Sequence, residues 1–195
     1  MTLRSWLDAL LHRTPAVPSV GIAELREDTL TRISGVVRVL DDASLIAPLS
    51  RRACVYYAVE VVRERRLDAL RQQLAFDQRW VPFEVDDGAR AVIDPIAARF
   101  SAEYDVGHPI EGTSEITPVE RELFERTSVD MRDWWDWRLR VKEAVVEVGQ
   151  TVAVLGSAVR ERDPYAGHEE LYRSDGATRF RFAGSPRYPL VITIV

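Results

Sequence analysis

Two hydrophobic periods alternate along the chain, one typical of a helix and the other of strands. Near the amino terminus, apolar residues recur at spacings of three and four: Leu3, Trp6, Leu7, Leu10 and Leu11. This spacing marks one apolar face of a helix. From residue 31 onward the period changes to two, as in half-buried strands. We therefore predict a helical extension over residues 1–30 and a single β domain over residues 31–195.

Strand periodicity recurs in short blocks that are rich in β-branched and aromatic residues, which favour strands. The blocks are residues 31–40, 54–62, 81–85, 90–93, 137–148, 151–159 and 190–195. The sharpest local prediction is a hairpin at Asp86-Asp87-Gly88, because Asp-Gly supplies the positive φ that a tight connection needs. Strands separated by turns at this density predict a mainly β fold, an OB-like barrel or sandwich of six or seven strands. An α+β arrangement is the alternative.

Two stretches interrupt the strand pattern and predict helical insertions, near residues 63–79 and 117–135. The first carries Leu67, Leu70 and Leu74 at helical spacing among many charges. The second opens with residues 117–120 (TPVE), a capping box with proline at the first helical position. Its helix should turn Leu123 and Phe124 inward. Between the insertions, His108-Pro109 indicates a polar loop.

Composition excludes several functional classes. The chain has 195 residues, 46% hydrophobic and 29% charged, which is typical of a globular domain. Cys54 stands alone, so an intrachain disulfide and a Cys-rich zinc module are excluded, and we interpret it as a core residue. The net charge of -5 argues against nucleic-acid partners, whose binding depends on neutralising phosphates.

Location is indicated by the apolar runs. No run approaches the roughly 20 residues of a transmembrane helix, and Arg4 and Asp8 interrupt the region where a signal peptide would be apolar. We expect a cytoplasmic protein, with peripheral membrane association through the amino-terminal helix as an alternative. Lys142 is the one lysine among 26 basic residues, a bias that suggests a bacterial source.

Four segments in order carry a family resemblance. An apolar-Pro stretch (residues 45–50) precedes Cys-x-Tyr-Tyr (54–57), a Phe-x-x-Asp-Asp-Gly hairpin spans residues 83–95, Glu-x-x-x-x-x-Gly covers residues 143–149, and x-Val-Leu-Gly follows at 153–156. In order and spacing these segments resemble the GIDE family. This family, also called the beside-a-membrane (BAM) domain, is named from a mitochondrial membrane-anchored ubiquitin ligase. The resemblance covers about residues 33–160, and the tail more loosely.

The resemblance implies a β-rich, OB-like module that sits beside a membrane and acts in interaction or sensing, without known catalytic residues. The chain departs from the ligase in two ways. It has neither flanking transmembrane helices nor a RING, whose zinc needs several Cys and His ligands. Ubiquitin-ligase activity and ubiquitin partners are therefore not expected. The chain is either a relative without membrane helices or the soluble part of a longer protein.

Catalytic chemistry requires a converging set of groups, and no such set is evident in the sequence. The three histidines are scattered, and His168 lacks the second histidine of a His-Glu-x-x-His metal helix. We therefore predict no catalytic residues, no cofactor and no metal. The alternative hypothesis is a hydrolase-type enzyme with a loop-built site around His108 and His168, together with Glu169 and Asp105.

A tryptophan cluster is the candidate binding site. Residues 131–137 contain Trp134, Trp135, Trp137 and Arg132. If this segment is helical, Trp134 and Trp137 share a face while Trp135 points elsewhere, so at least one ring is available to a partner; the alternative is that the rings pin an insertion helix onto the barrel. We expect a non-enzymatic interaction or sensor module. It would bind a protein partner, a membrane surface or a small ligand through this cluster or through the amino-terminal helix residues: Leu3, Trp6, Leu7 and Leu10.

Overall fold

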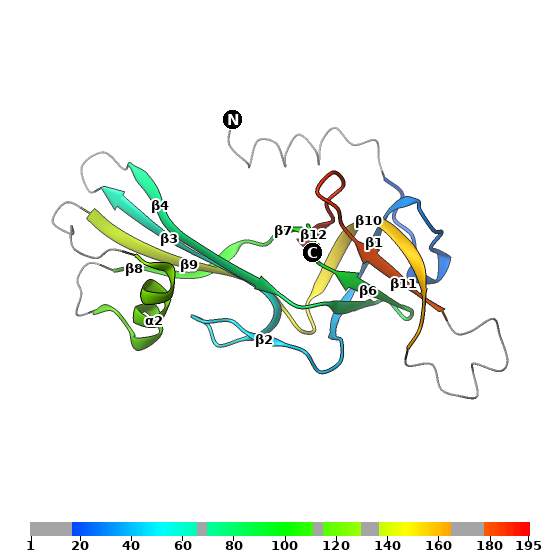
Figure 1. Ribbon diagram of the computed structural model, residues 1–195, viewed down its shortest axis with the longest axis horizontal. Coiled ribbons are helices and arrows are strands. Elements are labelled where there is room, and N and C mark those ends of the chain that lie inside the picture. Colours follow the sequence, from blue (N-terminus) through cyan, green and yellow to red (C-terminus); the bar gives the residue numbers. More distant parts are fainter. Residues whose placement is uncertain (1–16, 66–69, 111–114, 130–136, 165–177) are drawn as a thin grey trace.

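The computed structural model describes residues 17–65, 70–110, 115–129, 137–164 and 178–195, and these are mostly β. In chain order the elements are η1 (Ile22–Glu24), β1 (Leu30–Val39), β2 (Leu45–Ile46), β3 (Ala53–Arg65), β4 (Arg71–Trp80), β5 (Phe83–Asp86), β6 (Arg90–Asp94), β7 (Arg99–Ser101), β8 (Tyr104–Ile110), α2 (Pro118–Thr127), β9 (Trp137–Glu147), β10 (Thr151–Arg162), β11 (Thr178–Ala183) and β12 (Val191–Ile194). The predicted mainly β fold is confirmed. The strands form two sheets that follow one another along the long axis of the molecule (Figure 1).

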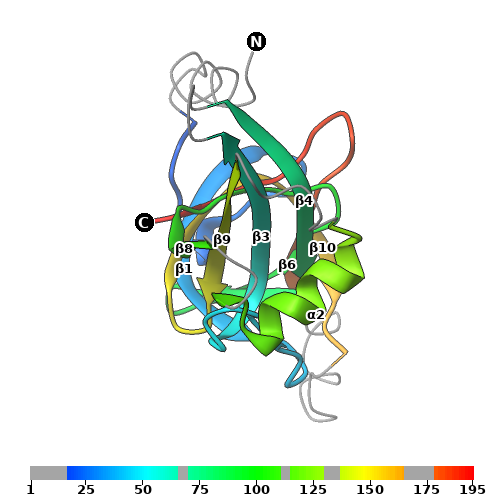
Figure 2. The ribbon, with the colours of Figure 1, turned by 90° about the vertical axis from the view of Figure 1, so that its left-hand side faces the viewer.

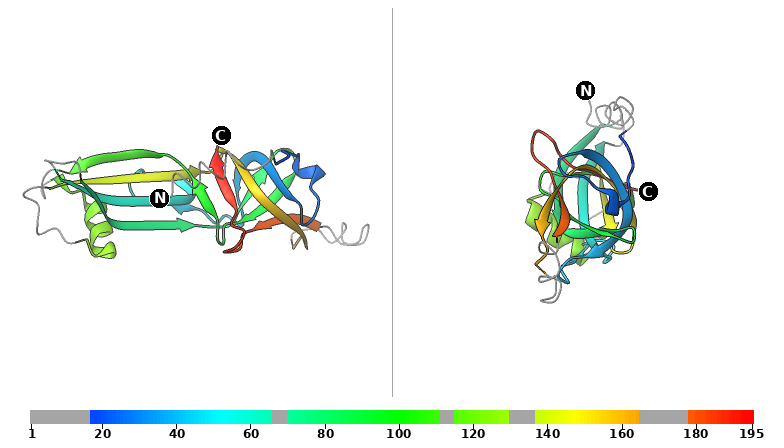
Figure 3. Two further views of the ribbon diagram at one scale, coloured as in Figure 1. Left: turned by 90° about the horizontal axis from the view of Figure 1, so that it is seen from above. Right: turned by 90° about the vertical axis from the view of Figure 1, so that its right-hand side faces the viewer.

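One sheet closes into a five-stranded barrel. Its order is β1-β5-β6-β11-β10, and β10 pairs again with β1, so that the strands form a ring when viewed end-on (Figure 3). Closure leaves these five strands without an open edge. Beyond the ring, β12 pairs with β10 and β7 pairs with β12. This barrel is consistent with the predicted OB-like architecture.

The barrel core is made by the inward positions of the alternating strands. Phe83, Phe182, Ile33, Ile93 and Val154 are fully buried in one cluster. The predicted hairpin is confirmed, since β5 pairs with β6 and Gly88 has a φ of 111°. The alternation that predicted these strands thus also defines which side chains fill the barrel.

The second sheet is antiparallel, in the order β2-β3-β9-β8. Strand β2 pairs with the first residues of β3, and β4 pairs with the residues of β3 that follow. Helix α2 covers one face of this sheet (Figure 2). The core beneath it contains Tyr57, Val59, Val61, Leu123 and Phe124. Strand β3 therefore packs on α2 with one face and on the barrel side with the other, which is why its residues 53–62 are apolar except for Glu60.

Helix α2 confirms the insertion predicted near residues 117–135. Thr117 and Glu120 form the capping box, with Pro118 in the first turn, and Leu123 and Phe124 are buried as expected. The helix ends at Thr127, and residues 130–136 lie outside the described residues.

The helical insertion predicted near residues 63–79 is wrong. Strand β3 continues to Arg65, and β4 occupies Arg71–Trp80. The helical spacing of the leucines led to a wrong prediction because β4 is a mostly polar edge strand without apolar alternation. It is extended because it pairs with the buried β3. Leu74 sits at the register shift of that pairing, and Leu70 is exposed.

The polar loop predicted at His108-Pro109 is also wrong, because both residues belong to strand β8. Proline is tolerated there because, within the described ranges, β8 pairs with β9 alone. Along with β4, the seven predicted blocks missed β2, β7, β8 and β11. These strands are short or lie at edges, where alternation is weak.

The predicted amino-terminal helix falls in residues 1–16, outside the described residues; the rest of the extension holds only the short turn η1. No helix in the described ranges is both long and apolar enough to cross a bilayer.

Candidate functional site

A groove of about 590 Å³ lies on the face of the second sheet that α2 leaves uncovered. Its walls come from five strands, β3, β4, β7, β8 and β9, which belong to both sheets. They carry the aromatic residues Tyr56 of β3, Phe76 of β4, Phe100 of β7 and Tyr104 of β8. The volume falls within the range of small-molecule and peptide side-chain pockets, roughly 300–1,000 Å³. The groove is therefore large enough to hold a ligand.

The aromatic rings divide into a stacked pair and an exposed pair. Tyr56 and Phe100 stack with ring centroids 3.7 Å apart and an interplanar angle of 8°. Phe76 and Tyr104 remain 47% and 42% exposed. Exposed aromatic rings beside a rigid stacked pair give a large apolar contact area with little loss of side-chain entropy on binding.

Polar groups in the groove and beside it contact one another. Lys142 Nζ lies 3.9 Å from Glu60 Oε2 and 5.7 Å from the centroid of the Tyr104 ring. The Tyr56 hydroxyl donates to Gln78 Oε1 at 3.4 Å. These contacts fix the polar side chains around the aromatic surface.

The two groove tyrosines stay neutral at physiological pH. Burial, and to a lesser extent the neighbouring Tyr104, raises the pKa of Tyr56 to about 12. Burial also raises the pKa of Tyr104, helped by the negative charge of Glu60. Both phenols therefore act as hydrogen-bonding groups rather than as bases.

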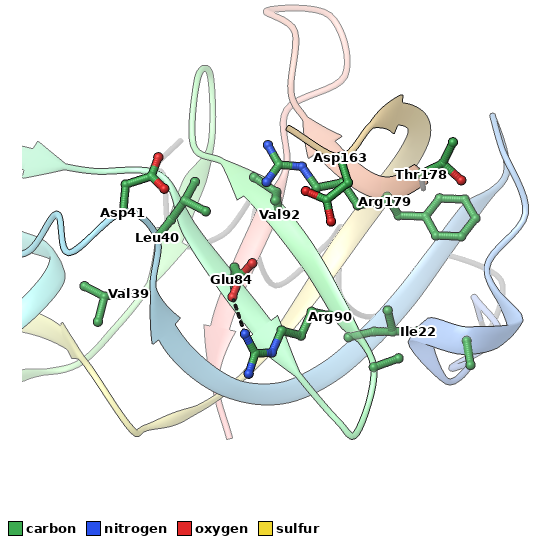
Figure 4. Close-up of a pocket in the computed structure, with 13 residues that line it drawn as sticks. Ile22, Val39, Leu40, Asp41, Glu84, Arg90, Val92, Asp163, Thr178 and Arg179 are labelled. Carbon is green, nitrogen blue, oxygen red and sulfur yellow. Dashed lines mark hydrogen bonds and ion pairs between the residues drawn. The ribbon is translucent and has the colours of Figure 1, made fainter. Parts of the chain in front are cut away.

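A second cavity, of about 560 Å³, opens beside the barrel (Figure 4). Two arginines of its lining have partners of opposite sign. Arg90 lies 3.4 Å from Glu84, and Arg179 lies 2.7 Å from Glu161. Because both arginines are already paired, this cavity is a weaker binding candidate than the aromatic groove.

Most of the predicted site residues lie outside the described residues. This applies to Arg132, Trp134 and Trp135, and to the helix residues Leu3, Trp6, Leu7 and Leu10. The backbone of Trp137 begins β9, opposite Arg65. The tryptophan cluster and the amino-terminal helix therefore remain predictions.

The residues of the hydrolase hypothesis have separate partners where the structure describes them. Both carboxylate oxygens of Asp105 accept from Arg52, at 2.7 and 2.8 Å, and this guanidinium lowers the pKa of Asp105. His108 Nε2 lies 2.9 Å from Oε1 of the buried Glu120. His168 and Glu169 lie outside the described residues.

A buried carboxylate ties the loop after β2 to the second sheet. Glu143 is fully buried, and its two oxygens accept the backbone N–H groups of Leu49 at 2.7 Å and Ser50 at 2.9 Å. Cys54 is fully buried nearby, as predicted for a core residue. Burial, and secondarily the charge of Glu143, raises its pKa to about 11, so the thiol is unreactive in the folded protein.

Comparisons with protein-family models, with curated proteins and with solved structures found no significant match. The geometry of the groove is therefore the basis for a functional proposal. Sequence reasoning missed this groove because Phe76 fell in a stretch interpreted as helical, and Phe100 and Tyr104 belong to strands that alternation did not indicate. The available signal in the sequence was the presence of aromatic residues, such as Phe76, within otherwise polar segments.

Proposed function

We propose that this chain is a non-catalytic interaction module, related to the GIDE family, that holds a segment of a partner protein in its aromatic groove. The observation that carries the proposal is the exposure of Phe76 and Tyr104 beside the stacked Tyr56 and Phe100. Large apolar side chains that gather in a hollow mark an interaction site. The cytoplasm, indicated by the sequence, is the proposed location.

The shape of the site favours a protein segment over a lipid surface. A bilayer accepts apolar side chains that protrude from a flat or convex face, whereas Tyr56 and Phe100 line the wall of a hollow. Gln73 and Gln78 add amide groups to its border. Such amides can hydrogen-bond a peptide backbone while the rings take its side chains.

Two contacts support the relationship to the GIDE family. Glu143, which opens the third resembling segment, accepts hydrogen bonds from Leu49 and Ser50 of the first. The second segment forms the β5–β6 hairpin of the barrel. Segments that resemble the family in sequence therefore contribute to one scaffold.

The proposal is tested by selecting random displayed peptides on the immobilised full chain and measuring their affinities. Phe76→Ser and Tyr104→Ser should each weaken binding by about tenfold or more, because they remove exposed rings from the groove. Ile96→Ser and Tyr188→Ser are matched controls, since these residues are 58% and 70% exposed and do not line the groove. Affinities that fall equally in all four variants, or a selection that yields no peptide, would overturn the proposal.

A further inference from the structure

Strand β4 leaves one edge of the second sheet open. Among the described residues β4 pairs with β3 alone. Its ten residues contain neither glycine nor proline. The opposite edge strand, β8, carries Gly107, Pro109 and a register shift between Tyr104 and Val106. Glycine, proline and register shifts in an edge strand hinder further pairing. Of the two edge strands, β4 is therefore the one better suited to pair with another strand.

The backbone groups of β4 that point outward can be assigned from its ladder. The Val81 N–H donates to the Val55 carbonyl at 3.0 Å. Because the direction alternates along an antiparallel strand, Arg79 and Asp77 also face β3. The N–H and C=O groups of Trp80, Gln78 and Phe76 therefore face away from β3, where a partner strand would lie.

We propose that β4 pairs antiparallel with β4 of a second copy of this chain, with Gln78 on the twofold axis. In this register Phe76 lies opposite the partner's Trp80, and Asp77 lies opposite the partner's Arg79. The first pair is hydrogen-bonded, and the charged pair occupies a non-hydrogen-bonded position, where cross-strand side chains are closest.

Charge complementarity selects this register. An axis at Asp77 would place two carboxylates opposite each other, and an axis at Arg79 would place two guanidinium groups together. An axis at Phe76 or Trp80 leaves both charges opposite uncharged residues. Among the axes from Phe76 to Trp80, the one at Gln78 alone joins opposite charges, and it does so twice because of the symmetry.

The existing contacts of β4 are compatible with this dimer. Arg126 donates to Oδ2 of Asp77 at 2.6 Å, which leaves Oδ1 for the partner's Arg79. Phe76 and Trp80, which are 47% and 41% exposed, would cover each other across the axis. Since alternation places both rings on the groove face of the sheet, dimerisation would join the two grooves into one surface.

Sedimentation of the full chain from micromolar to several hundred micromolar tests the pairing. The wild type should dimerise. Gln78→Pro removes the outward N–H and should weaken association by about tenfold or more, whereas the matched Gln78→Ala keeps this N–H and should dimerise. Far-ultraviolet circular dichroism checks that the proline variant stays folded. A monomeric wild type, or dimerisation that Gln78→Pro does not weaken, would overturn the proposal. An extended peptide would then be the remaining candidate partner for the β4 edge.

The register is tested by charge reversal. Asp77→Arg and Arg79→Asp should each be monomeric, because each places like charges opposite each other. A mixture of the two variants restores both opposite-charge pairs and should form a heterodimer. Failure of the mixture to associate, while the wild type dimerises, would overturn this register. Neither substitution touches Tyr104, so this result is separable from the groove test.

Discussion

Replacing Glu143 by alanine should destabilise the fold strongly, although the residue lies outside the groove. Its carboxylate is fully buried and accepts two backbone N–H bonds, from Leu49 at 2.7 Å and Ser50 at 2.9 Å. A hydrogen bond to a charged group contributes about 1.5–3 kcal/mol, so the loss of both, with the two N–H groups left unpaired, should cost about 3–5 kcal/mol. This is a large part of a typical stability of about 5–15 kcal/mol.

Urea unfolding is the assay. Glu143→Ala should lower the midpoint at an unchanged slope, because the loss acts on the native state. Glu143→Gln keeps the volume and one acceptor and should cost less. Glu147→Gln is the matched control: Glu147 lies on the same strand but is 39% exposed at its side chain, so the change should cost below about 1 kcal/mol. Equal losses of stability at Glu143 and Glu147 would show that burial of the Glu143 carboxylate does not set its contribution.

Three further predictions concern packing, the thiol and acid stability. Gly35→Ala should cost about 1–3 kcal/mol in urea unfolding, because its Cβ would lie 2.6 Å from a backbone oxygen; Gly21→Ala, with 3.7 Å of clearance, should be neutral. Cys54, fully buried with a pKa near 11, should resist iodoacetamide at neutral pH until urea unfolds the chain; rapid native labelling would contradict its burial. Because Arg52 lowers the pKa of Asp105 below its ordinary 3.8, this pair stabilises the fold above that value and is lost as pH falls below it. Arg52→Gln should therefore flatten the acid end of the stability profile; an unchanged profile would contradict the pairing.

The barrel could be predicted from the sequence because its strands bury one face, and burial imposes a period of two. The β5–β6 hairpin and the cap of α2 could be predicted equally well, since Gly88 and Thr117 act through local backbone chemistry. Strand β4 could not be predicted from the sequence, because an edge strand with both faces partly exposed needs no apolar alternation. Its state is imposed by β3, which is a tertiary effect.

The groove was hidden for a related reason. Tyr56, Phe76, Phe100 and Tyr104 come from four strands, and only the pairing of β3 with β4 and the path of β7 and β8 bring them together. The sequence instead pointed to the tryptophan cluster at residues 131–137, where the aromatic residues are adjacent in the chain. That hypothesis stays open, since Trp134 and Trp135 lie outside the described residues.

The proposed function requires that a partner segment binds in the aromatic groove. Nuclear magnetic resonance of the isotope-labelled full chain, titrated with the tightest selected peptide, locates the bound segment residue by residue. Amide shifts should concentrate on the residues around Tyr56, Phe76, Phe100 and Tyr104, and should be much smaller in the Tyr104→Ser variant at the same peptide concentration. Shifts confined to the α2 face or to the cavity beside the barrel would contradict the claim.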